Sequence, residues 1–132
     1  MLDVKLDAPG LLRVESLRIT LTFNRTSPTT GRISWNIPTP AAGCTADNQA
    51  YCGMLITVRT KELPIPRPED HVKYSYDNTV SGTLFAGDRI GDSMVVAALY
   101  HDRVTTFIDI EDIDPNLDYF ISGFPVDCET RY

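Results

Sequence analysis

Apolar and polar residues alternate with a period of two along most of this chain, and this alternation sets the fold class that it can adopt. Every second residue is apolar from Leu17 to Phe23, and Ile33, Trp35 and Ile37 repeat the pattern. Such a period describes a strand with one buried and one solvated face. No window of helical length carries apolar residues at a sustained three-four spacing. The sequence therefore predicts an all-β chain.

Turn signals divide the chain into short segments. Asn24 to Gly31 is rich in turn residues, and Pro115-Asn116 marks a later corner. Further strands are expected at 51–60, 72–76, 93–100 and 104–110, and a last one near Leu117. About seven short strands without a helix indicate a β-sandwich or a β-barrel.

The segment 93–100 is apolar on both faces. A strand of this kind is either covered on both sides within its own domain or lies at a contact between subunits. The residues that we predict for an interface with another chain are Val96, Ala98, Tyr100, Tyr74 and Tyr76.

The size and the charge of the chain narrow its class. With 132 residues and 42% hydrophobic content, it fits one domain with a core of its own. Its 12 basic and 18 acidic residues give a net charge of -6, and no stripe of basic residues is present to neutralise phosphates. No stretch approaches the ~20 apolar residues that cross a bilayer. We expect neither nucleic acid as a partner nor a membrane span.

The three cysteines, Cys44, Cys52 and Cys128, are an odd number and form no CxxC pair. Cys44 and Cys52 flank one loop and would bridge in an oxidising compartment. The first residues alternate apolar and charged groups, unlike a signal peptide, so we expect reduced thiols. The histidines, His71 and His101, stand apart from one another, and no zinc site is predicted.

Three further features raise the question of chemistry. An acidic cluster offers oxygen ligands for calcium, but it lacks the glycine-centred loop of a calcium hand. It consists of Asp109, Glu111, Asp112, Asp114 and Asp118. The glycine-flanked segment 87–91 lacks the lysine of a phosphate loop, and no nucleophile elbow accompanies the histidines. We predict no catalytic residue, no cofactor and no metal.

The segment 113–121, IDPNLDYFI, resembles the Leu-x-Pro-x-Thr-x-Tyr-x-Val corner of fibronectin type III modules, with Ile113 for leucine and Leu117 for threonine. Trp35 stands where this family places a buried tryptophan. The resemblance implies an immunoglobulin-like sandwich of two sheets, in which the indole fills the gap between the sheets and the tyrosine hydroxyl ties the corner to nearby backbone. The residues expected in its core are Leu21, Ile33, Trp35, Tyr119 and Ile121.

A narrower likeness covers the segments 51–56, 87–92, 105–109 and 126–132. In this order and spacing they are similar to the version of the module found in tailed-bacteriophage virion proteins and in bacterial surface proteins. The likeness spans about residues 11 to 132. We therefore expect residues 1–10 to form an N-terminal extension or edge strand, and residues 11–132 to form the sandwich.

The resemblance breaks off at Tyr132, where the family continues with one more strand. The sandwich is therefore expected to lack its last strand or to borrow it. Either the chain is a fragment of a longer protein, or a neighbouring chain or the segment Leu2 to Ala8 supplies the missing edge. An open edge is a template for the addition of a strand.

The resemblance implies a function without chemistry. We expect a structural protein of the tail, baseplate or collar of a tailed-phage particle, located in the virion and assembled in the host cytoplasm through contacts with other virion subunits. One alternative is a carbohydrate-binding or adhesion module, in which Tyr74, Tyr76 and the loop Thr39 to Asn48 touch a glycan. Another is an accessory domain of a bacterial surface hydrolase.

Overall fold

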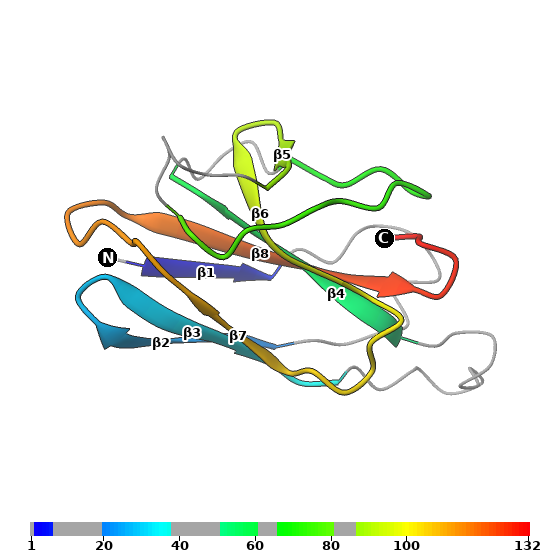
Figure 1. Ribbon diagram of the computed structural model, residues 1–132, viewed down its shortest axis with the longest axis horizontal. Coiled ribbons are helices and arrows are strands. Elements are labelled where there is room, and N and C mark those ends of the chain that lie inside the picture. The colour runs from blue at the N-terminus through cyan, green and yellow to red at the C-terminus, as the bar shows by residue number, and fades with distance from the viewer. Residues whose placement is uncertain (1, 7–19, 38–50, 61–65, 81–86) are drawn as a thin grey trace.

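Two β-sheets that share one core form the body of the protein (Figure 1). The computed structural model describes residues 2–6, 20–37, 51–60, 66–80 and 87–132, and these contain no helix. The strands are β1 (Leu2–Leu6), β2 (Leu21–Ser27), β3 (Thr30–Trp35), β4 (Tyr51–Arg59), β5 (Arg89–Ile90), β6 (Ser93–Tyr100), β7 (Phe107–Ile110) and β8 (Tyr119–Asp127). Their order is β1-β8-β4-β6-β5 in one sheet and β2-β3-β7 in the other. The all-β prediction is confirmed, and the arrangement agrees with a β-sandwich.

The core lies between the two sheets and contains residues of both. Strand β3 contributes Ile33 and Trp35, while β4 contributes Met54, Ile56 and Val58. The five residues expected in the core are all buried in this cluster, namely Leu21, Ile33, Trp35, Tyr119 and Ile121. Because burial of one large apolar side chain stabilises a fold by about 1.5–3 kcal/mol, this layer holds the two sheets together.

The outer face of the five-stranded sheet is also covered. A second cluster of buried residues packs there, consisting of Leu55, Ile90, Val95, Ala98, Phe124, Val126 and Tyr132. Tyr74, from the segment 66–80, packs against this cluster together with Tyr100. The segment 66–80 and the C-terminal residues therefore form a third layer over the sheet.

Strand β6 is buried on both faces as a result. Val96 has no exposed surface and belongs to the core, and Ala98 keeps 6% of its surface exposed in the outer cluster. This corrects the prediction that Val96 and Ala98 contact another chain, because the chain's own residues cover both. Of the two alternatives for this strand, coverage within its own domain is the one that the structure supports.

Strand β1 lies at the edge of the five-stranded sheet, parallel to β8. Leu2 is opposite Tyr119, and Leu6 is opposite Gly123. Figure 1 shows this strand in blue beside the orange-to-red strand β8. Of the sources expected for the missing edge, the N-terminal segment is therefore the one that lies next to β8.

Strands β2 and β3 form a tighter hairpin than expected. The turn-rich region 24–31 is mostly strand, and Pro28 and Thr29 alone separate β2 from β3. Ser27 and Thr30 face each other across the turn. The Thr30 hydroxyl oxygen lies 2.7 Å from that of Ser27 and 2.8 Å from that of Thr26. Hydroxyl pairs of this kind stabilise the end of a hairpin, so polar residues continue the strand.

The segment 72–76, predicted as a short strand, pairs with no strand among the described residues. Two of its amides bond to side chains instead. Tyr74 N–H donates to the Tyr100 hydroxyl, and Ser75 N–H donates to the Asp88 carboxylate, both at 2.8 Å. The alternation that suggested a strand belongs to a loop that lies on the sheet.

Candidate functional site

Three of the tyrosines form a chain of hydrogen bonds on the outer face of the five-stranded sheet. The Tyr132 hydroxyl donates to Val72 O at 2.8 Å. Its one proton is thereby used, so the Tyr100 hydroxyl donates to Tyr132 at 2.6 Å and accepts from Tyr74 N–H. Burial is the main cause that raises the pKa of Tyr132, with its hydrogen bond to Tyr100 second. These side chains fix the C-terminal residues and the segment 66–80 to the sheet.

This chain of tyrosines accounts for two of the predicted interface residues. Tyr74 and Tyr100 are half-buried and engaged within the protein, whereas Tyr76 remains 49% exposed. The predicted aromatic surface for a glycan therefore retains Tyr76 alone of these residues. The loop Thr39 to Asn48, the other part of that prediction, lies outside the described residues.

The outer edge of β7 in the three-stranded sheet is partly open. The hydrogen bond from Trp35 N–H to Thr106 O, at 2.8 Å, fixes the phase of the β3–β7 ladder. Ladder bonds alternate in direction along an antiparallel strand. Thr106 and Ile108 therefore bond to β3. Phe107 and Asp109 turn their backbone N–H and C=O groups to the outer edge.

The far end of this edge is capped by the segment 78–80. Glu111 N–H donates to Asn78 O, and Val80 N–H donates to Glu111 O, both at 2.8 Å. The Asn78 side-chain amide donates to Asp109 O at 2.9 Å. Within the described part of the chain, nothing bonds to the N–H and C=O of Phe107 or to the N–H of Asp109. We call the open stretch Phe107–Asp109 the β7 edge.

The side chains of the β7 edge combine an aromatic ring with an ion pair. Phe107 is 45% exposed, and the Arg32 guanidinium lies 4.0 Å from its ring centroid. Arg32 also donates two hydrogen bonds to Asp109, at 2.8 and 3.2 Å. This pair lowers the pKa of Asp109 and raises that of Arg32. Because Arg32 covers one face of the phenyl ring, that face cannot stack on a sugar.

No three carboxylates of the acidic cluster gather at ligand distance among the described residues. Asp109 pairs with Arg32, and Asp114 caps the corner by accepting from Asn116 N–H at 2.9 Å. Asp112 and Asp114 line a cleft of about 620 Å³ that Arg89 also lines.

The corner itself has the expected tyrosine contact. The Tyr119 hydroxyl accepts the backbone N–H of Asp114, five residues earlier, at 2.8 Å. The same residue buries its ring in the core. A tyrosine in this position ties a loop to the strand that follows it.

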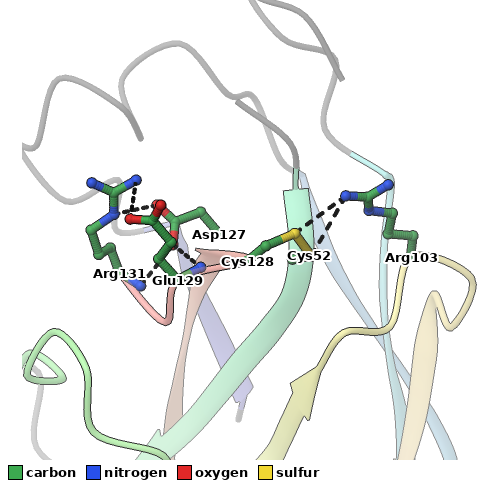
Figure 2. The surroundings of a disulfide bond; sticks show 6 residues. All are labelled: Cys52, Arg103, Asp127, Cys128, Glu129 and Arg131. Atoms are coloured by element: carbon green, nitrogen blue, oxygen red, sulfur yellow. Dashed lines mark hydrogen bonds and ion pairs between the residues drawn. A yellow bond between two sulfur atoms is a disulfide. The ribbon is translucent and has the colours of Figure 1, made fainter. Parts of the chain in front are cut away.

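A disulfide joins Cys52 to Cys128 across a sequence separation of 76 residues (Figure 2). Cys52 belongs to β4, and Cys128 directly follows β8. These strands are antiparallel neighbours, with Tyr51 opposite Asp127 and Gly53 opposite Val126. The Cα atoms are 5.0 Å apart, a separation that a disulfide spans. The prediction of reduced thiols is wrong for this pair, and Cys44 lies outside the described residues.

Two basic side chains surround the disulfide. The Arg103 guanidinium lies 3.2 Å from Cys128 Sγ and 3.7 Å from Cys52 Sγ. Figure 2 draws these two contacts as dashed lines from Arg103 to the disulfide. A ring nitrogen of His101 lies within 4.8 Å of both sulfurs. Sequence spacing did not reveal this group, because the pairing of β4 with β8 and the turn after β6 bring its members together. We call Cys52, Cys128, His101 and Arg103 the disulfide centre.

The other histidine has a structural position. His71 is close to the C-terminal residues. Its ring Nδ1 lies 3.1 Å from the backbone oxygen of Glu129, and its backbone N–H donates to Thr130 O at 2.6 Å. These contacts help to hold the C-terminal residues in place.

No protein-family model matches this sequence, and neither a curated protein nor a solved structure shows a significant match. The described residues include no helix that is long and apolar enough to cross a membrane.

Proposed function

We propose that this chain is a non-enzymatic assembly module that docks an extended segment of another protein along the β7 edge. The observation that carries the proposal is the N–H and C=O of Phe107 and the N–H of Asp109, to which nothing in the described part of the chain bonds, next to a phenyl ring that is 45% exposed. An added strand would take up these groups by main-chain hydrogen bonds, and its side chains would contact the ring.

The charge around the β7 edge favours a partner of a different sequence. Exposed carboxylates of Glu111, Asp112 and Asp114 follow the strand directly. Two copies paired in parallel through β7 would bring these like charges side by side, which weakens association. A partner strand flanked by lysine or arginine would instead be attracted, most strongly at low ionic strength.

A tailed-phage particle is the setting that we propose for this docking. The resemblance of the corner around Tyr119 to fibronectin type III modules supports it, as does the narrower likeness to virion modules. In such a particle, many modest contacts act together in a symmetric array. The chain would then be a subunit of the tail, baseplate or collar.

The experiment compares particles purified from a host that expresses either the wild-type chain or Phe107→Pro. Proline at position 107 removes an outward N–H and keeps the bonds to β3. We expect peptide mass spectrometry to find the wild-type chain as a stoichiometric component of the particles and to find the variant at a tenth of that level or less. Absence of the wild-type chain from particles would contradict the virion setting.

Arg25→Pro is the matched control. Arg25 of β2 is opposite Gly31 of β3, and the backbone groups of Gly31 face β7. The N–H of Arg25 therefore points away from β3, toward the other edge of the same sheet. We expect this variant to enter particles normally. Both variants should retain the circular-dichroism spectrum of the wild type. Normal incorporation of a folded Phe107→Pro chain would rule out the β7 edge as the docking site.

A further inference from the structure

The disulfide centre brings three ligand atoms of the kinds that zinc prefers into one place. The two Sγ atoms and a ring nitrogen of His101 all lie within 4.8 Å of one another. Zinc binds thiolate sulfur at ~2.3 Å and imidazole nitrogen at ~2.0 Å, so the ligands of one tetrahedral ion are roughly 3.5–4 Å apart. Small side-chain rotations over a Cα separation of 5.0 Å would allow the two sulfurs to reach that spacing once their bond is broken.

The backbone holds His101 beside the sulfurs through a rigid turn. His101 has a positive φ of 53°, and the next residue, Asp102, donates its N–H to Cys52 O at 3.0 Å. The Asp102 carboxylate accepts from Val104 N–H, from Thr105 N–H and from the Thr105 hydroxyl, at 2.6 to 2.9 Å. These bonds lower the pKa of Asp102, with the Thr105 hydroxyl as the largest cause. The backbone of His101 is therefore held beside Cys52 without a metal ion.

Arg103 gives the site a charge that suits thiolates. Its guanidinium already donates toward both sulfurs, at 3.2 and 3.7 Å. Two thiolates and one Zn²⁺ sum to a neutral group, so the guanidinium does not oppose the ion as a whole. N–H donors that point at metal-bound sulfur orient the ligand and stabilise its charge.

The site is also open to solvent on one side. Cys128, His101 and Arg103 are exposed, while Cys52 is buried. These residues line a shallow hollow together with Val104. Access through this hollow admits both a reductant and a metal ion, and it leaves a fourth coordination position for water.

We propose that Cys52, Cys128 and His101 form a redox-controlled zinc site, which is closed as a disulfide in oxidising surroundings and binds Zn²⁺ after reduction. Two small-molecule thiols supply two electrons and two protons to the disulfide and become a disulfide themselves. The two cysteine thiols then lose their protons to solvent as Zn²⁺ binds both sulfurs and the His101 nitrogen. The same side chains thus serve as a covalent bond or as a metal site.

Cobalt binding to the full chain tests this proposal. The chain carries Cys44→Ser, so that the third thiol supplies no ligand. It is reduced with a phosphine, desalted without oxygen and titrated with Co²⁺ alone. We expect one Co²⁺ per reduced chain, with a thiolate-to-cobalt charge-transfer band and the intense visible bands of a tetrahedral ion. We expect no such bands from the oxidised chain, and Zn²⁺ should displace the cobalt.

The two histidines provide a matched pair of variants. Asparagine tolerates positive φ, and both His101 and His71 have it, at 53° and 68°. His101→Asn should weaken cobalt binding by roughly tenfold or more and change the visible bands, because one ligand is lost. His71→Asn should bind cobalt as the parent chain does. Circular dichroism of each reduced variant verifies its fold.

Three results would overturn the proposal. The first is a folded, reduced chain without a thiolate-to-cobalt band. The second is a His101→Asn chain that binds Co²⁺ as tightly as the parent. The third is a chain that unfolds on reduction and is not refolded by Co²⁺ or Zn²⁺.

Discussion

The indole nitrogen of Trp35 donates a hydrogen bond to the Tyr51 hydroxyl at 3.1 Å, inside the core. Trp35 ends β3 in one sheet, and Tyr51 begins β4 in the other. Both side chains are buried, with 5% and 4% of their surface exposed. The bond therefore links the two sheets and satisfies the polar atom of the largest side chain in the core.

Removal of the Tyr51 hydroxyl should leave the indole N–H without its partner. We expect Tyr51→Phe to lower the free energy of unfolding by about 1–3 kcal/mol, the cost of an unsatisfied buried donor. Urea denaturation followed by tryptophan fluorescence measures this change. Tyr76→Phe is the control, since Tyr76 is 49% exposed, and its effect should stay within about 0.5 kcal/mol. Equal stability of the two variants would contradict the role of the bond.

Alkaline pH should destabilise the protein through its buried tyrosines. Burial is the main cause that raises the pKa of Tyr51, to about 12, and burial also raises the pKa of Tyr132. An unfolded chain ionises its phenols near pH 10, before the folded chain does. Stability should therefore be constant below about pH 10 and fall as the pH rises toward about 12. Urea midpoints across this range measure the slope, and Tyr51→Phe should reduce it.

Gly53 occupies a position in β4 that no side chain can share. Its φ is +156°, and a Cβ built there would meet the Leu99 carbonyl oxygen of β6. We expect Gly53→Ala to lower the free energy of unfolding by about 3 kcal/mol or more, from strain and overpacking together. A thermal midpoint equal to that of the wild type would show that the backbone relaxes instead.

Much of the fold followed from local pattern. The period of two indicated an all-β chain because half-buried strands require it, and β3 lies where that pattern was expected. β6 coincides with the segment 93–100, which was expected as a strand that is apolar on both faces. The core position of Tyr119 came from the resemblance to a known corner, and that of Trp35 from the tryptophan that the same family buries. Their burial, and the bond from Asp114 N–H to the Tyr119 hydroxyl, match it.

The misplaced interface shows what local pattern does not contain. A strand that is apolar on both faces needs two covers, and the sequence of β6 does not say whether the second cover is another chain or the same one. Here Tyr132 and Tyr74 supply it from 32 and 26 residues away from Tyr100. Neither the alternation of residues around Tyr74 nor the position of Tyr132 in the sequence indicates that these side chains cover β6.

The disulfide centre depended on the register of distant strands. Cys52 and Cys128 become neighbours only because β4 and β8 are paired, and His101 joins them only because β6 pairs with β4 on its other side. The alternating apolar and charged residues at the start of the chain predicted reduced thiols, and they carry no information on the contact between Cys52 and Cys128. The β7 edge was missed in the same way, since the open backbone depends on how segment 78–80 caps Glu111.

Reduction of the disulfide should destabilise the fold even without metal. The bond closes a loop of 76 residues in the unfolded chain, and loss of such a cross-link costs about 2–4 kcal/mol, mainly because the unfolded chain gains freedom. Urea denaturation in the presence of a chelator, with and without reductant, measures the difference and keeps it separate from zinc binding. The double variant Cys52→Ala, Cys128→Ala should match the reduced chain, whereas Cys44→Ser should match the oxidised wild type. A urea midpoint that reductant leaves unchanged would show that Cys52 and Cys128 are not bonded in solution. Breaking an existing disulfide gives the unfolded chain more freedom and must therefore lower the midpoint.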